Sequence, residues 1–240
     1  MSYCFISDLH LNQDRPDITK AFLNFLENTA HKAEKLYILG DLFEAWIGDD
    51  DQNEFISEIQ NALIRINKTT KVFFMHGNRD FLIGPDFASS AGMKILNDPV
   101  VEEMFGYTVL LMHGDLLCTE DIDYQKFRKV SRDTEWQKEF LSKPLAERKV
   151  IAQNLRGASK EATGKKKEEI MDVSESEVIK MIQESSVSLL IHGHTHRPNS
   201  HSIALEKHTA KRIVLGDWDK YGWYVWMDSN SCELNKFSIS

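Results

Sequence analysis

Aspartate, asparagine and histidine side chains stand at the ends of five apolar runs that are spread along the chain. The apolar runs are residues 3–7, 36–39, 72–75, 109–112 and 187–191. The polar segments that follow them are Asp8-Leu9-His10, Gly40-Asp41, Gly77-Asn78-Arg79-Asp80, His113-Gly114-Asp115 and Gly193-His194-Thr195-His196. Parallel strands that end at one edge would gather these groups in one crevice. Seven oxygen and nitrogen ligands together predict two divalent cations and metal-assisted hydrolysis of a phosphoester.

The spacing of the polar residues supports this interpretation. Asp8 and His10 are two residues apart, so on an extended strand end both point to the same side. His194 and His196 repeat this arrangement, whereas His192 is expected to point elsewhere. Asp41 has two carboxylate oxygens and is our choice for a ligand shared by two cations.

Each motif alone has a simpler interpretation. Gly-Asp and Gly-Asn are commonly turns, and a lone histidine such as His113 at the end of an apolar strand is commonly a hydrogen-bonded core residue. The amide oxygen of Asn78 is a neutral ligand that adds no negative charge. The joint presence of all five segments, each after an apolar run, favours a metal site.

The rest of the chain predicts an α/β fold. Apolar residues recur at helical spacing in 21–26 and 55–66, with strand-like runs between them. Helix formers dominate 121–176, which indicates a helical cap inserted between two ligand-bearing strands. After His196 the chain becomes β-rich. The expected consecutive antiparallel strands are 200–205, 211–215, 223–227 and 233–239.

Composition limits the possible partners. A chain of 240 residues predicts one domain with an insertion, and its three cysteines suit reduced thiols in a cytosolic protein. We expect no signal peptide and no spanning helix. The net charge is −8, yet residues 124–167 carry 13 Lys and Arg against five Asp and Glu. This asymmetry predicts a basic face for an anionic partner, or merely a solvated helical surface. We expect no nucleic-acid partner, because the basic segment has no recognisable reading motif.

The ordered set of five motifs resembles the calcineurin-like metallophosphoesterase family, and the resemblance spans Asp8 to His196. It implies an αββα sandwich that carries a dinuclear metal site. It assigns one metal to Asp8, His10, Asp41 and His196. It assigns the other metal to Asp41, Asn78, His113 and His194.

Longer strings at 40–50, 77–82 and 192–198 resemble the bacterial subfamily that hydrolyses UDP-2,3-diacylglucosamine in lipid A biosynthesis. This resemblance implies Mn²⁺ as cofactor, UMP and 2,3-diacylglucosamine 1-phosphate as products, and work at the cytoplasmic face of the inner membrane. The implied catalytic residues are Asp41, Asn78, Arg79 and His194. The implied substrate contacts are Asn78, Arg79, Asp121, Ser159, Thr163, Lys166 and His194. The subfamily has Asn at the place of Thr163.

Many family members have Gly-Asn-His, whereas this chain has Arg79 after Asn78. An arginine cannot donate a proton but neutralises a phosphoryl group, which suits a leaving group that needs no proton. We therefore expect water, activated between two cations, to attack the α-phosphorus of a pyrophosphate. Alternatives are a family enzyme that acts on a soluble nucleotide and, from another class, a scaffold without catalysis.

The segment 121–176 offers both cations and apolar side chains for an anionic lipid. The cations include Arg128, Arg132 and Arg156. The apolar candidates for acyl-chain contact are Phe127, Val130, Trp136, Phe140 and Leu155, although Phe140 and Leu155 could equally serve internal packing. Asp121 could likewise simply begin a helix.

Overall fold

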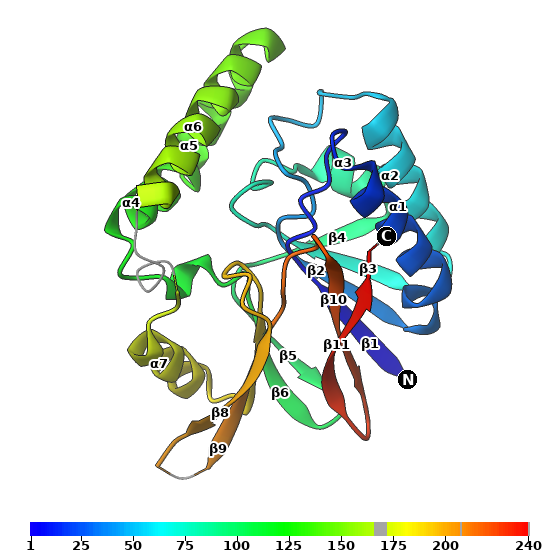
Figure 1. Cartoon of the computed structure of the whole chain (residues 1–240), viewed down its shortest axis with the longest axis vertical. Helices are drawn as coiled ribbons and strands as arrows, with labels where there is room; N and C mark the ends of the chain where they lie inside the picture. Colours follow the sequence, from blue (N-terminus) through cyan, green and yellow to red (C-terminus); the bar gives the residue numbers. More distant parts are fainter. Residues whose placement is uncertain (166–171, 207, 240) are drawn as a thin grey trace.

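Two β-sheets stacked face to face form the centre of the molecule (Figure 1). The computed structural model describes residues 1–165, 172–206 and 208–239, with side chains for all of these except 158–165. In spatial order, the first sheet contains β11 (Cys232–Ser238), β10 (Tyr221–Asp228), β1 (Ser2–Ile6), β2 (Lys35–Leu39), β3 (Lys71–Met75) and β4 (Met93–Leu96). The second contains β5 (Val100–Met104), β6 (Tyr107–Leu111), β7 (Leu189–His192), β9 (Thr209–Val214) and β8 (Asn199–Ala204).

Parallel strands occupy the middle of each sheet. Strands β1 to β4 run parallel in the first sheet, and β6, β7 and β9 run parallel in the second. Antiparallel strands close the edges, with β10 and β11 on the first sheet and β5 and β8 on the second. The carboxyl ends of the central strands therefore present their following loops on the same side of the sandwich, as the sequence predicts.

Helices cover the outer faces and produce three layers of apolar packing. The helices on the first sheet are α1 (Pro16–Asn28), α2 (Glu54–Ile66) and α3 (Pro85–Ser90), with a short 3-10 turn η1 (Ala30–Lys32) after α1. Phe22 and Ile59 of these helices pack in one cluster with Ile38 of β2. Phe5 and Ile191 meet between the two sheets. Helix α7 (Glu175–Ser185) packs on the second sheet. The αββα sandwich is confirmed.

Local sequence explains where the helices lie. Helix α1 begins at Pro16, a position in the first turn where the backbone amide has no partner within the helix. The side chain of Asn53 accepts a hydrogen bond from the amide of Ile56 at 2.9 Å and so caps α2. The helical spacing predicted within 55–66 gives α2 one buried face, which includes Ile59 and Leu63.

The five apolar runs are confirmed as strands β1, β2, β3, β6 and β7. The prediction of consecutive antiparallel strands after His196 is wrong in its pairing. Strands β8 and β9 form a hairpin in the second sheet, and β10 and β11 form one in the first. Alternating hydrophobicity identifies a strand but not its neighbour, because the chain crosses between sheets after Val214.

Three successive helices rise from one side of the sandwich (Figure 1). They are α4 (Ile122–Ser131), α5 (Thr134–Ser142) and α6 (Leu145–Lys165), and they follow the 3-10 turn η2 (Asp115–Leu117) that comes after β6. They lie between β6 and β7 in the sequence, within the predicted cap segment. Below they are called the cap helices. None of the described helices is long and apolar enough to cross a membrane.

A buried arginine fastens the base of the cap helices to the core. Arg148 of α6 is 2% exposed. Its guanidinium donates to the carbonyl oxygen of Ile47 at 2.5 Å and to the carboxylate of Asp50. It also donates to the carbonyl of Lys143 at 3.0 Å. This side chain therefore satisfies backbone groups of two segments at once.

Replacing Arg148 with Met should destabilise the protein, because the buried carbonyl of Ile47 and the partly buried carbonyl of Lys143 lose their donor. Such a loss costs about 2 kcal/mol, which corresponds to a fall in Tm of roughly 4–8 °C for a chain of this size. The matched control is Lys149→Met, since Lys149 forms only an exposed ion pair with Asp51. Thermal unfolding followed by circular dichroism measures both variants. Equal Tm shifts in the two variants would contradict the structural role of Arg148.

Candidate metal and active site

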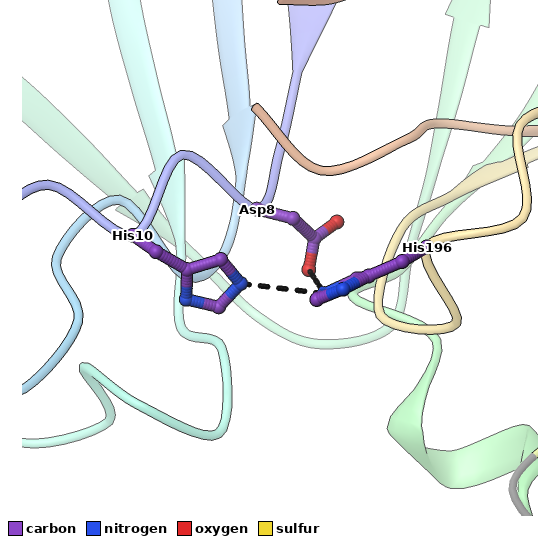
Figure 2. A group of neighbouring side chains, drawn as sticks. All are labelled: Asp8, His10 and His196. Carbon is purple, nitrogen blue, oxygen red and sulfur yellow. Dashed lines mark hydrogen bonds and ion pairs between the residues drawn. The ribbon is translucent and has the colours of Figure 1, made fainter. Parts of the chain in front are cut away.

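The structure brings all seven predicted ligand residues into one cluster at the carboxyl ends of the strands. Asp8, His10 and His196 form its first part (Figure 2). The Nε2 atoms of the two histidines lie 3.3 Å apart, and His196 Nε2 lies 3.4 Å from Asp8 Oδ1. Residues near the start of the chain therefore meet residues near position 196. The loops after β1 and β7 lie close together, although the two strands belong to different sheets.

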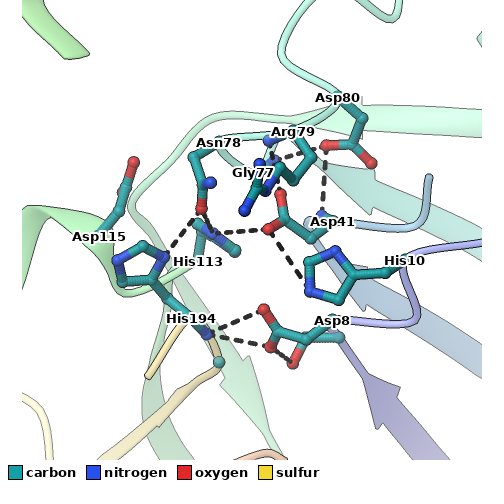
Figure 3. Close-up of polar contacts among 12 residues, drawn as sticks. Asp8, His10, Asp41, Gly77, Asn78, Arg79, Asp80, His113, Asp115 and His194 are labelled. Atoms are coloured by element: carbon teal, nitrogen blue, oxygen red, sulfur yellow. Dashed lines mark hydrogen bonds and ion pairs between the residues drawn. The ribbon is translucent and has the colours of Figure 1, made fainter. Parts of the chain in front are cut away.

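Asn78, His113 and His194 form the second part (Figure 3). The Oδ1 atom of Asn78 lies 3.0 Å from His113 Nε2 and 2.9 Å from His194 Nδ1. Asp41 stands between the two parts, with its Oδ2 4.0 Å from His10 Nε2 and 3.8 Å from His113 Nε2. The sequence-based choice of Asp41 as the shared residue thus agrees with its position.

The backbone of the cluster is strained, and the extended conformation predicted for Asp8 with His10 and for His194 with His196 is wrong. Asp8, His10, Asp41, His194 and His196 all have positive φ angles, between 50° and 69°. A residue other than glycine rarely adopts this left-handed conformation, because it costs free energy of order 1–3 kcal/mol. Strain of this kind concentrates at functional sites, where the surrounding structure holds it in place.

Two glycines allow the loops to approach one another. A Cβ atom on Gly77 would collide with the carboxylate and the amide of Asp41. A Cβ atom on Gly193 would collide with Asp8 and Ser7. The glycine of the Gly-Asn motif is therefore needed where two loops of the first sheet meet, and the glycine of the Gly-His motif where loops of the two sheets meet.

Neighbouring groups orient the histidine rings. His113 Nδ1 donates to the carbonyl oxygen of Leu39 at 2.9 Å, which orients the ring so that Nε2 points toward Asn78 Oδ1. His10 Nδ1 lies 3.1 Å from Glu44 Oε2, although the alignment falls short of a hydrogen bond. Glu44 also accepts from Arg156 of α6 at 2.5 Å. Such contacts direct the free nitrogens of His10 and His113 into the cluster.

Asp80 fastens two of the ligand loops together. Its carboxylate is completely buried and accepts from the amides of Leu42 at 2.7 Å and Gly77 at 2.9 Å, and from Asp41 at 3.2 Å. Burial, together with the negative charge of Asp41, raises its pKa to about 7. Asp80 therefore sets the separation between Asp41 and Asn78, a role that the sequence did not suggest.

The electrostatics of the cluster are dominated by buried carboxylates. Burial opposes the charge on Asp8, yet the contact and charge of His196 hold its pKa well below the usual range. Burial also opposes a charge on His113, yet Asp41, Asp115 and Asp8 raise its pKa to about 9. Burial and the nearby His113 lower the pKa of His194 to about 4. The site as a whole attracts positive charge.

The donor set fits divalent cations. Imidazole, carboxylate and amide oxygen suit first-row metals such as Mn²⁺, Fe²⁺ and Zn²⁺. Two donors at right angles around an ion, each about 2.1 Å from it, lie roughly 3 Å apart. The separations of 2.9 to 3.4 Å within each part match that requirement.

A cavity of about 320 Å³ opens beside the cluster, between the core loops and the cap helices. Asn78 and Arg79 line it on the core side, and Nε of Arg79 is buried without a hydrogen-bond partner among the described residues. Most of its lining is apolar. The apolar lining residues are Ala45, Trp46, Ile47, Phe81, Leu82, Phe127, Trp136, Phe140, Ala152 and Leu155.

Some cap predictions agree with this cavity and others need correction. Phe127, Trp136, Phe140 and Leu155 line it, whereas Val130 is 50% exposed and does not. The helical spacing of apolar residues does not by itself show which of them face the cavity and which face solvent.

The predicted cap cations need a second correction. Arg128 and Arg132 do not line the cavity; they bind acidic and carbonyl groups of the core. Arg156 does line it and pairs with Glu44. The sequence shows how many charged residues a segment has but not what they bind. The excess of Lys and Arg in 124–167 therefore overstates the positive charge that is free to bind a ligand.

The predicted substrate contacts divide into two groups. Asn78, Arg79 and Asp121 line the cavity, and His194 lies in the adjoining cluster. Asp121 also caps α4, because its side chain accepts from the amide of Tyr124 at 3.1 Å. The side chains of Ser159 and Thr163, and the whole of Lys166, lie outside the described residues.

Sequence reasoning missed several residues of the site. Glu44, Trp46 and Ile47 stand within a string that carried the resemblance, but their roles depend on contacts with segments distant in sequence. Phe81 and Leu82 follow Asp80 and form the core-side wall of the cavity. Both groups follow a ligand motif closely in the sequence, and this position was the signal that could have identified them.

Known proteins resemble this chain over its whole length. A UDP-2,3-diacylglucosamine hydrolase of Marinobacter nauticus is 49% identical over 231 residues, which cover 96% of this chain and 95% of that protein. A protein of the same description from Cellvibrio japonicus is 44% identical, and one from Pseudomonas paraeruginosa is 49% identical, each over all of both chains. A solved archaeal phosphodiesterase shares the fold, with 14% identity, 99% coverage of each chain and a TM-score of 0.50.

The calcineurin-like phosphoesterase family matches residues 1–198, which include all five ligand segments. Members of this family use divalent metal ions, in agreement with the donor set described above. This chain therefore belongs to the calcineurin-like phosphoesterase family.

Proposed function

We propose that this protein hydrolyses UDP-2,3-diacylglucosamine to UMP and 2,3-diacylglucosamine 1-phosphate, a step of lipid A biosynthesis. The relatives from Marinobacter, Cellvibrio and Pseudomonas carry that hydrolase description. The observation that supports the proposal most is the apolar cavity that adjoins the ligand cluster through Asn78 and Arg79. A diphosphate at the cluster would place attached acyl chains at that cavity.

We assign two divalent cations, most simply Mn²⁺, to the cluster. Asp8, His10, Asp41 and His196 would hold one, and Asp41, Asn78, His113 and His194 the other. When bound, such a pair supplies a Lewis acid and lowers the pKa of water so that it becomes a nucleophile at neutral pH. The strained backbone and the buried carboxylates support this assignment, because both hold the donors in place before any ion arrives.

The chain's own residues bind and orient the diphosphate. Arg79 lines the cavity, and its buried Nε has no hydrogen-bond partner among the described residues, which suits the phosphoryl oxygens. Water attacks the α-phosphorus, a new P–O bond forms, and the bond to the bridging oxygen breaks with its electron pair leaving on the sugar phosphate. That product has a second pKa near 6, so it departs without a proton from Arg79.

The cap helices supply the place for the acyl chains. Trp136 and Phe140 of α5 line the cavity together with Trp46 and Phe81 of the core. A soluble nucleotide would leave this wall in contact with water, at a cost of about 25 cal/mol per Å² of apolar surface. The apolar lining therefore favours a lipid substrate over a soluble one. The complete set of clustered ligand residues favours an enzyme over a scaffold that does no chemistry.

Purified protein with Mn²⁺ should hydrolyse UDP-2,3-diacylglucosamine and leave UDP-N-acetylglucosamine and bis-p-nitrophenyl phosphate almost unchanged. Removal of the metal by a chelator should abolish turnover, and Mn²⁺ should restore it. In ¹⁸O-water the label should enter UMP. Label in the sugar phosphate would contradict attack at the α-phosphorus, and equal rates on all three substrates would contradict the lipid assignment.

Replacing Arg79 with Ala should lower kcat/KM by about 10²-fold or more, because a charge-stabilising group is lost in the transition state. Metal content should not change, since the amide of residue 79, and not its side chain, donates to Asp41 Oδ1 at 2.8 Å. Steady-state kinetics and elemental analysis of the same sample measure both quantities. Arg79→Lys keeps the charge and should recover part of the activity. Loss of metal in Arg79→Ala would overturn this role.

We further propose that the cap helices contact the cytoplasmic face of the inner membrane. Of ten exposed large apolar residues in the described chain, five lie on the cap helices: Ile122, Val130, Leu141, Val150 and Leu155. Exposed apolar groups within a basic segment suit reversible binding to an anionic bilayer.

Vesicles that contain phosphatidylglycerol should bind the protein in a flotation assay, and vesicles of phosphatidylcholine alone should bind it several-fold less. Binding should weaken as salt rises, because surface charges are screened. Val150→Glu should reduce binding, whereas Ile64→Glu, an exposed substitution on α2, should not. Equal binding by both variants would argue against a contact through the cap helices.

A further inference from the structure

One face of α4 contacts the loops that hold half of the ligand cluster. Tyr124 and Arg128 of α4, and Arg132 at its C-cap, are spaced four residues apart, so they lie on one side of the helix. All three approach the buried carboxylate of Asp115, and each also makes a second contact with the core, to His194, Asp98 and Gly77 respectively. Below they are called the α4 face.

Arg128 bridges two carboxylates that flank His113. Its Nη2 donates to Asp98 Oδ2 at 3.1 Å, and its Nε donates to Asp115 Oδ2 at 2.9 Å. The other oxygen of Asp98 accepts from the backbone amide of His113 at 3.1 Å. Asp115 follows His113 by two residues and is completely buried. The position of His113 is thus tied to a side chain of α4.

The two other members of the α4 face contact the remaining ligand segments. Arg132 donates to the carbonyl oxygen of Gly77 at 2.8 Å, directly before Asn78. The Tyr124 ring lies 5.6 Å from the His194 ring, and its hydroxyl donates to Asp115 at 2.6 Å. Asn78, His113 and His194 are therefore each supported by α4.

The other half of the cluster depends on different contacts. His10 faces Glu44, which pairs with Arg156 of α6, and Asp8 accepts from Ser7 at 2.5 Å and from the amide of His194. His196 Nδ1 lies 3.7 Å from Asp217. Among the described residues, the hydrogen bonds, ion pairs and ring contacts of Tyr124, Arg128 and Arg132 do not reach Asp8, His10 or His196.

We propose that the α4 face positions the Asn78, His113 and His194 ligand group and so determines the affinity of one of the two metal positions and not the other. This inference rests on the metal assignment proposed above. Arg128, Tyr124 and Arg132 act as positioning residues in it, because they touch the ligand segments and not the reacting atoms. Groups that orient metal ligands in this way change metal affinity by about 10- to 100-fold when they are removed.

The test is a titration of metal-free protein with Mn²⁺, without substrate, by calorimetry and by electron paramagnetic resonance. Two neighbouring Mn²⁺ ions give an exchange-coupled signal, whereas a single ion gives the signal of an isolated Mn²⁺. In Arg128→Lys the charge remains but the two-pronged bridge is lost. We expect one site of unchanged affinity, a second site weakened about 10-fold or more, and an isolated-ion signal at one equivalent.

Tyr124→Phe is the second variant, because it removes only the hydroxyl that binds Asp115 and should fold even where Arg128→Lys does not. It should weaken the same site by a smaller factor. Lys126→Met on the exposed side of α4 is the matched control, since Lys126 pairs only at the surface with Asp123. Circular dichroism serves to check that each variant is folded.

The outcomes separate the two proposals. A wild-type protein that never shows a coupled signal overturns the two-metal assignment itself. A normal wild type with variants that keep both affinities, or that lose both sites equally, overturns the role of the α4 face. Selective weakening of one site in Arg128→Lys or in Tyr124→Phe, with Lys126→Met unchanged, supports it.

Discussion

The structure depends on the burial of negative charge at one place. Asp8, Asp41, Asp80 and Asp115 are each at most 1% exposed and stand around the same loops. A buried carboxylate is costly unless hydrogen bonds or opposite charge compensate it. Asp80 is compensated by backbone amides, and Asp115 by Arg128 and Tyr124. Asp8 and Asp41 instead face histidines, a partnership that bound cations would complete.

The sequence predicted the parts of this arrangement that are local. An apolar run with a polar end is visible in a few residues, so the five strands and the seven clustered side chains could be predicted. The pairing of β9 with β7, and of β10 with β1, could not, because both neighbours are distant in sequence. The role of Asp80 could not be predicted for the same reason, since its partners include the loop after β2.

The cap helices illustrate the limit of counting charges. The surplus of Lys and Arg in 124–167 predicted either a basic face for an anionic partner or a solvated helical surface. In the structure Arg128 is held by Asp98 and Asp115, and Arg148 by Asp50 and backbone carbonyls. These arginines carry interactions between the cap helices and the core. A net charge does not separate cations that bind a ligand from cations that hold two parts of the fold together.

The same helices form a wall of the cavity and support one ligand group, and this has a thermodynamic consequence. Tyr124 lines the cavity while its ring faces His194 and its hydroxyl binds Asp115. A molecule in the cavity that favours one position of α4 would also favour one geometry of that ligand group. Because linkage is reciprocal, metal binding there would strengthen binding in the cavity by the same factor. A cap of this kind would make acyl-chain recognition and metal organisation a single property of the fold.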